Sequence, residues 1–134
     1  MSKIYFYDTG LAAALLEIDN ASQLEFHPFR GSIFENLVIV DFVKQDYNRG
    51  KRGNFYFWRD STGNEIDLLI ERGNKLIPVE IKSGQTITDE FFKGFRYWKK
   101  LTGYEGGFVV YGGDMVQKRS DGVTVVSLDE LDSV

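Results

Sequence analysis

The stretch that most constrains the fold covers residues 65–82 and reads EIDLLIERGNKLIPVEIK. Two segments rich in apolar residues flank Gly73 and Asn74, a dipeptide suited to the positive φ angles that two-residue hairpin turns require. The pattern therefore predicts a β-hairpin in which Arg72 faces Lys75.

This turn also predicts the register of the hairpin. Counting outward from the turn places Asp67 opposite Glu80 and Glu65 opposite Lys82. Because strand side chains alternate between faces, the apolar residues are expected together on the other face. They are Ile66, Leu68, Ile70, Ile77, Val79 and Ile81. Pro78 interrupts the pattern, since proline favours a bulge or an edge strand, and a bulge there would shift the pairing by one residue.

The polar face of the hairpin carries two opposed carboxylates, Asp67 and Glu80. Like charges at directly opposed positions are destabilising, so the pair needs a shared proton or a cation. Hard oxygen ligands of this kind suit Mg²⁺, Mn²⁺ or Ca²⁺, and the ammonium of Lys82 could orient a water beside the ion. The alternative is a solvated face on which Lys82 pairs with Glu65 and Asp67 is tolerated at a sheet edge.

Composition limits the class of protein. The 134 residues suit one domain, and 43% hydrophobic residues with plentiful aromatics indicate a packed core. A net charge of -4 argues against a broad basic DNA-binding surface but leaves room for a local basic groove. The absence of cysteine excludes disulfides and thiolate metal sites, and no apolar run reaches the roughly 18 residues of a membrane span. We expect a cytoplasmic chain without a membrane segment, and the sequence holds no G-x-x-x-x-G-K-[ST] phosphate loop that would bind ATP.

The remaining elements follow from periodicity. A long helix is predicted over residues 32–47, an aromatic strand over 54–59, a second helix over 88–101, and strands over 108–111 and 123–126. The predicted fold class is therefore α/β (α+β), a mixed sheet of four to five strands flanked by helices. The order is one helix, three strands, one helix, one strand and a further strand.

The N-terminal part has a different character. A short helix is predicted over residues 11–16, and residues 19–28 are expected to be a polar connection in which His27 is a loop or packing residue. We interpret residues 1–28 as the end of an upstream region and residues 29–134 as the main domain.

Glu35 lies early in the long helix and has two interpretations. Ser32 and Glu35 match a capping box, in which Glu35 bonds back to the helix start. Alternatively, Glu35 lies at the margin of the apolar stripe and points toward the sheet and the acidic pair.

Two basic groups are candidate contacts to nucleic acid, although each can equally be a solvated surface. They are Arg49, Lys51 and Arg52 in a glycine-punctuated turn, and Lys93, Arg96 and Lys100 on one stripe of the second helix.

The assembled order resembles the restriction-endonuclease-like nuclease superfamily, whose signature is an Asp followed by Glu-x-Lys on adjacent strands, often with a Glu from the first helix. The match falls on Glu35, Asp67, Glu80 and Lys82. A closer resemblance is to the C-terminal domain of unknown function that follows a AAA-type ATPase module in many bacterial and archaeal proteins. It rests on residues 5–11, 31–38, 58–60, 65–67 and 79–83.

This resemblance implies a catalytic site. Asp67, Glu80 and the backbone carbonyl of Ile81 would hold Mg²⁺ or Mn²⁺, Lys82 would position the attacking water, and Glu35 would bind water around the metal or a second ion. ATP hydrolysis would belong to an upstream domain absent from this sequence, linked covalently to it.

Three hypotheses follow for the function. The first is a metal-dependent phosphodiesterase acting on DNA or RNA. The second is an inactive module on the same scaffold that binds nucleic acid or a protein partner of the ATPase. The third is a dimerisation domain that forms a homo-oligomer.

Overall fold

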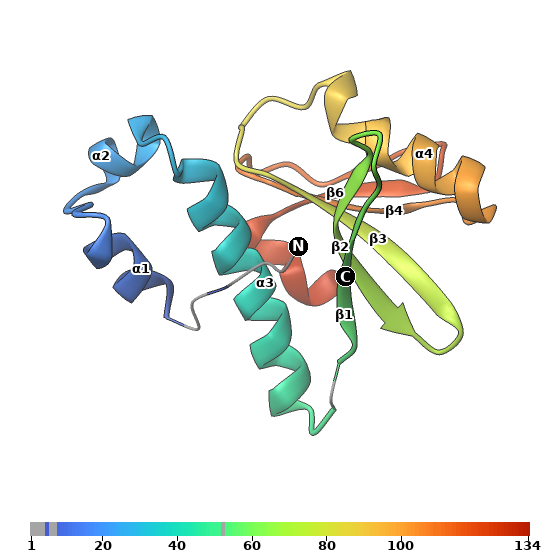
Figure 1. Ribbon diagram of the computed structural model, residues 1–134, viewed down its shortest axis with the longest axis horizontal. Helices are drawn as coiled ribbons and strands as arrows, with labels where there is room; N and C mark the ends of the chain where they lie inside the picture. Colours follow the sequence, from blue (N-terminus) through green and yellow to red (C-terminus); the bar gives the residue numbers. More distant parts are fainter. Residues whose placement is uncertain (1–4, 6–7, 52) are drawn as a thin grey trace.

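The computed structural model describes residues 5, 8–51 and 53–134. The helices are α1 (Thr9–Leu15), α2 (Ala21–Phe26), α3 (Arg30–Asn48) and α4 (Lys93–Thr102), with 3-10 helices η1 (Asp89–Phe92) and η2 (Leu128–Ser133). The strands are β1 (Phe55–Arg59), β2 (Glu65–Arg72), β3 (Lys75–Lys82), β4 (Gly107–Tyr111), β5 (Gln117–Lys118) and β6 (Val123–Ser127). Figure 1 shows α3 and α4 on opposite sides of the sheet, so the chain forms three layers.

The described strands form one mixed sheet in the order β1-β2-β3-β4-β6-β5. β1, β2 and β3 are successive antiparallel neighbours, β3, β4 and β6 are parallel, and β5 pairs antiparallel with β6. The mixed α+β class is confirmed, and so are the strands predicted over residues 108–111 and 123–126, which are β4 and β6. The expected four to five strands is wrong, because the sheet has six. The two residues of β5 are too few to produce a periodic pattern.

The predicted turn is confirmed, and the register is confirmed as far as Leu68 opposite Val79, where the ladder ends before the predicted pairs of Asp67 with Glu80 and of Glu65 with Lys82. The pairs of the hairpin run from Arg72 opposite Lys75 to Leu68 opposite Val79, without a shift. Pro78 pairs with Leu69 inside this ladder and lies in an interior strand, so the predicted disturbance at this proline is wrong.

The irregularity lies instead on the other edge of β2. Tyr56 of β1 pairs with Leu69, whereas Trp58 pairs with Ile66, so β2 carries one extra residue in this interval. The bulge resets the alternation of β2: Ile66 packs with Leu69 against α4, whereas Leu68 packs on the α3 side. The prediction of one shared apolar face is therefore wrong for Ile66.

Helix α3 covers one face of the sheet because its apolar side chains recur with helical spacing. Val38, Ile39 and Phe42 are buried there against strand residues and Leu131 of η2. Leu37, by contrast, is exposed.

The opposite face is covered by η1 and α4. Phe91, Phe92 and Phe95 pack there on residues of β4 and β6. The second helix, predicted to end at residue 101, ends at Thr102, where Gly103 follows with φ 78° and donates its N–H to Lys99 O. The two helices thus bury both faces of β3, the strand that carries Glu80 and Lys82.

Residues 19–28, expected to be a connection, contain α2, so that prediction is wrong. The helix forms because Asn20 caps it, with its side-chain oxygen accepting from Gln23 N–H at 2.9 Å. His27 ends this helix and accepts a hydrogen bond from Phe29 N–H at 3.1 Å, which is the loop role expected for it. The boundary at residue 28 stays a prediction. Within the described ranges, no helix is long and apolar enough to span a membrane.

Candidate functional site

The acidic pair lies where β2 and β3 separate. The last pair of the ladder is Leu68 with Val79, and one step further Asp67 Oδ2 accepts the backbone N–H of Ile81 at 2.8 Å. A side chain therefore takes over a hydrogen bond at the end of the ladder. Asp67 is only 8% exposed, so this bond fixes a buried carboxylate at the open end of the hairpin.

Lys82 provides the cation that the two carboxylates share. Its Nζ lies 3.2 Å from Glu80 Oε2 and 3.9 Å from Asp67 Oδ2. Glu65 pairs with Arg59 at 3.1 Å. The alternative of a solvated face, in which Lys82 pairs with Glu65 and Asp67 lies at a sheet edge, is therefore wrong.

Burial makes this charge cluster unusual. Glu80 is 4% exposed, and its burial, reinforced by the nearby charge of Asp67, raises its pKa to about 8 even though Lys82 opposes the shift. Burial lowers the pKa of Lys82, but the charges of Asp67 and Glu80 outweigh it, so the pKa lies above the ordinary value. At neutral pH the lysine is charged and Glu80 retains a proton.

Gly94 of α4 makes room for the carboxyl group of Glu80. A Cβ atom at Gly94 would lie 2.8 Å from Glu80 Oε1 and 3.1 Å from Ile66 Cδ1. Glu80 Oε1 itself is buried and has no hydrogen-bond partner among the described residues. One oxygen of the pair is thus held against helix backbone without a donor.

Glu35 approaches from α3. It is half-buried and accepts a hydrogen bond from Tyr5 Oη at 3.0 Å. Burial and the charge of Glu35 together raise the pKa of Tyr5. No side chain caps α3, which starts at Arg30, so the capping box with Ser32 is wrong.

Two open clefts meet at Lys82. One, of about 440 Å³, is lined by Glu35, Ile81, Lys82 and residues at the start of α3. The other, of about 200 Å³, lies under α4 and is lined by Glu80, Lys82, Lys93 and Tyr97, among others. Lys82 can therefore be reached from both sides of β3.

The acids do not form a closed ligand cluster. Over residues 5, 8–51 and 53–134, no three His, Asp or Glu side chains gather closely enough to hold a metal ion. Asp67 and Glu80 both lie next to Lys82. Glu35 lines the larger cleft together with Lys82.

The predicted nucleic-acid contacts are scattered. Lys93 lines the α4 cleft, whereas Arg96 is engaged by Asp89 through two hydrogen bonds of 3.1 and 3.0 Å. Lys100 is exposed near the end of α4.

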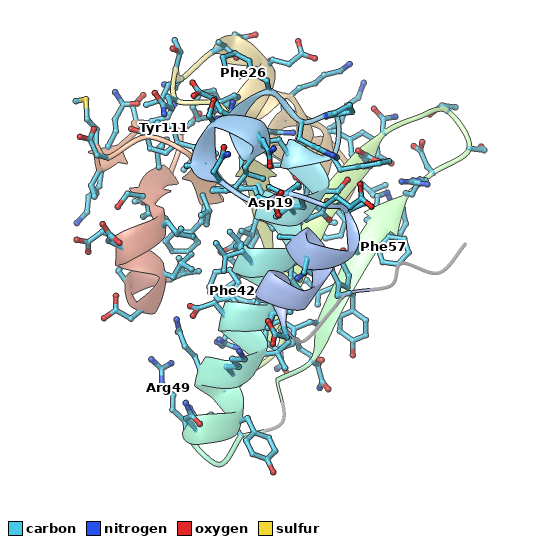
Figure 2. The ribbon with its side chains drawn as sticks, turned by 90° about the vertical axis from the view of Figure 1, so that its left-hand side faces the viewer. Asp19, Phe26, Phe42, Arg49, Phe57 and Tyr111 are labelled. Atoms are coloured by element: carbon cyan, nitrogen blue, oxygen red, sulfur yellow. The ribbon has the colours of Figure 1, made fainter. Side chains whose placement is uncertain are left out.

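The basic turn after α3 lies far from the acidic pair. Arg49 follows the last residue of α3, about 21 Å along the helix from Glu35 at 1.5 Å per residue. Figure 2 shows Arg49 at the lower end of this helix. Lys51 lines a separate opening with Asp46, and Arg52 lies outside the described residues.

Two features of the clefts escaped the sequence analysis. Asp60 accepts hydrogen bonds from the N–H groups of Thr62 and Asn64 and from Tyr97 Oη, which fastens the β1–β2 loop to α4. Asn64 and the other donors hold the pKa of Asp60 well below its ordinary value. Arg30 joins the start of α3 to the end of β3 by donating to Ser83 O at 2.7 Å. The turn pattern D-S-T-G-N could have revealed the hydrogen bonds of Asp60 within the loop. No sequence signal pointed to the contact between Arg30 and Ser83.

Fold and site together define an α+β chain with a six-stranded mixed sheet, in which one lysine joins two buried carboxylates at the end of a hairpin. The chain belongs to the family described as Domain of unknown function (DUF4143), which matches residues 30–131.

Two relatives are similar over almost the whole chain. They are Uncharacterized protein Mb2031c of Mycobacterium bovis and Uncharacterized protein Rv2008c of Mycobacterium tuberculosis, each 30% identical over 129 residues. The alignments cover 96% of this chain and 28% of each relative, so the chain spans little more than a quarter of their length. A search of solved structures found no significant match.

Proposed function

We propose that this chain is a metal-dependent phosphodiesterase domain for nucleic acid, built on a restriction-endonuclease-like fold. The observation that carries the proposal is the buried pair of Asp67 and Glu80 around Lys82, at the meeting point of two open clefts. An acid pair buried in an apolar core is costly, and perturbed carboxylates in a cleft are a common feature of catalytic sites.

The residues present fit a divalent cation. Two carboxyl groups face one ammonium, and Glu80 Oε1 lacks a partner among the described residues, so the site has more oxygen ligands than Lys82 engages once Glu80 loses its proton. Asp67, Glu80 and the carbonyl of Ile81 would hold Mg²⁺ or Mn²⁺, and Glu35 would hold its water or a second ion. The ion would polarise a phosphate oxygen and lower the pKa of its bound water.

The protein's own groups have defined tasks in this proposal. The bond from Ile81 N–H keeps the carboxylate of Asp67 in place. The side chain of Lys82 is 32% exposed, so its ammonium can leave the carboxylates and contact a phosphate oxygen or the attacking water. Lys93, on the rim of the α4 cleft, would bind a neighbouring phosphate.

An inactive module is the second candidate, and two observations favour it. Lys82 already neutralises part of the acid pair, as a purely structural ion pair would. The net charge of -4 also suits a protein partner better than nucleic acid.

We extend the proposal to the whole protein. The chain covers 28% of each relative, which is consistent with a larger protein in which an upstream ATPase module drives or regulates this domain in the cytoplasm.

Cleavage assays test the catalytic proposal. Plasmid, single-stranded and branched DNA, and RNA, are incubated with Mg²⁺ or Mn²⁺ and with the wild type, Asp67→Asn, Lys82→Ala or the control Glu90→Gln, which alters an exposed acid on the cleft rim. We expect cleavage by the wild type and the control only. Equal cleavage by all four proteins would reveal a contaminating nuclease.

Calorimetry separates the two candidates. Saturable Mn²⁺ binding that Asp67→Asn abolishes and Glu90→Gln preserves supports the phosphodiesterase. Absence of saturable binding by the wild type favours the inactive module.

A further inference from the structure

The segment before α3 presents exposed aromatic rings beside the larger cleft. Pro28 and Gly31 line this cleft, and the neighbouring Phe26 and Phe29 are 81% and 53% exposed. Figure 2 shows Phe26 at the top of the molecule, at the end opposite Arg49. Large aromatic side chains at such exposure leave apolar surface in water, and two of them beside a cleft indicate a contact surface.

Phe29 is held in position. Its N–H donates to His27 Nδ1 at 3.1 Å, and the two ring centroids lie 5.6 Å apart with the planes tilted by 36°. The exposed ring is therefore supported by a second ring and by a backbone hydrogen bond.

Arg30 adds an unneutralised positive charge. Its guanidinium donates to the backbone carbonyls of Ser83 at 2.7 Å and Glu25 at 3.5 Å. Among residues 5, 8–51 and 53–134, no carboxylate forms an ion pair with it within 4.0 Å, and a guanidinium has five N–H donors. Arg30 holds its guanidinium at Ser83, a residue that lines this cleft, so its remaining N–H donors lie next to the cleft.

We infer that Phe26, Phe29 and Arg30, here called the aromatic rim, bind single-stranded nucleic acid and lead it into the cleft toward Lys82. The inference rests on the proposed function and specifies its substrate class. Aromatic rings that stack on bases beside a positive charge are the usual means of holding a single strand. The cleft, of about 440 Å³, has the size of a site for one small ligand such as a single nucleotide.

Fluorescence anisotropy tests the aromatic rim without catalysis. A labelled twelve-residue oligo-dT and a labelled blunt duplex are titrated with protein in EDTA and low salt. We expect the single strand to bind at least ten times more tightly than the duplex. Phe26→Ala and Phe29→Ala should each weaken single-strand binding by about fivefold or more. The matched control is Tyr47→Ala, which removes an aromatic ring that is 78% exposed at the other end of α3 and should leave binding unchanged.

A salt titration tests Arg30 separately. Arg30→Gln should reduce the slope of log K against log salt by about 0.7, the value for one phosphate contact on a single strand. A purely structural role for Arg30 would weaken binding without changing this slope.

Three results would overturn the inference. The first is equal affinity of the wild type for the single strand and the duplex, the second is unchanged single-strand affinity in both Phe variants, and the third is no binding of any oligonucleotide. Binding that depends on the rings but is never followed by cleavage with Mg²⁺ or Mn²⁺ would refute the phosphodiesterase and leave the inference intact. Cleavage of duplex alone would support the phosphodiesterase and refute the inference of a single-stranded substrate.

Discussion

The buried carboxyl group of Glu80 should make the stability of the fold depend on pH. Its pKa of about 8 lies above the ordinary value of 4.5. Between these two pH values the folded chain keeps a proton that the unfolded chain loses, so stability falls as the pH rises through this window and levels off above pH 8. Replacing Glu80 by Gln imitates the protonated group at every pH.

The size of the effect follows from the two pKa values. At about 1.4 kcal/mol per pH unit, the wild type should lose at most about 5 kcal/mol of unfolding free energy relative to Glu80→Gln between pH 4.5 and 8. The raised pKa of Lys82 acts only above its ordinary value of 10.5, and the lowered pKa of Asp60 acts only in acid, so neither contributes in this window.

Urea unfolding followed by the fluorescence of Trp58 and Trp98 at pH 5, 6, 7 and 8 measures this difference. We expect the curves of the wild type and Glu80→Gln to diverge as the pH rises. Glu90→Gln removes an exposed carboxylate of the same cleft and should follow the wild type at every pH. Parallel curves for the wild type and Glu80→Gln would show that Glu80 is ionised in the fold, and the assignment of a retained proton would be wrong.

Two further predictions concern the clefts. Gly94→Ala should lower the unfolding free energy by about 1 to 3 kcal/mol in urea titrations, because the new Cβ would lie 2.8 Å from Glu80 Oε1. The control is Gly31→Ala, whose Cβ would meet only Ser83 Oγ at 3.9 Å and which should be neutral or stabilising. Asp60→Asn should flatten the fall in melting temperature below pH 4, because the lowered pKa of Asp60 provides stability above that pH that protonation removes, and an unchanged acid profile would contradict this role.

The hairpin shows what local sequence determines. Turn chemistry and the apolar pattern act between residues that are close along the chain, so Gly73 and Asn74 sufficed to predict the register as far as Leu68 and Val79. The same reasoning placed α3, α4 and the parallel strand β4, because long periodic segments leave few alternatives.

The disturbance of the register illustrates what could not be predicted. A bulge was predicted at Pro78 because proline lacks the backbone N–H that a strand ladder uses. The β2–β3 ladder nevertheless continues through Pro78 without a shift. The bulge lies between Tyr56 and Trp58 of β1 and the facing part of β2, where the sequence contains no Gly or Pro signal. The bulge depends on the packing of Ile66 and Leu69 against α4 and of Leu68 on the α3 side. Such contacts between distant elements cannot be read from local sequence.

The position of Lys82 is the other feature that spacing alone could not give. A period of two predicts that Glu80 and Lys82 share a face, and the structure adds that the ammonium lies between both carboxylates. Side-chain conformation decides this, and it depends on Asp67 being anchored by Ile81 N–H.

The contact between Lys82 and the acids links the two candidate functions. A lysine that is 32% exposed and close to a buried acid pair can be a permanent structural counterion, or it can hold the site together until a divalent cation replaces it. Lys82 engages Glu80 Oε2 and Asp67 Oδ2, whereas Glu80 Oε1 is buried and lacks a partner among the described residues. The site therefore has more acceptor capacity than Lys82 satisfies, and this excess is what a metal ion and its substrate would use.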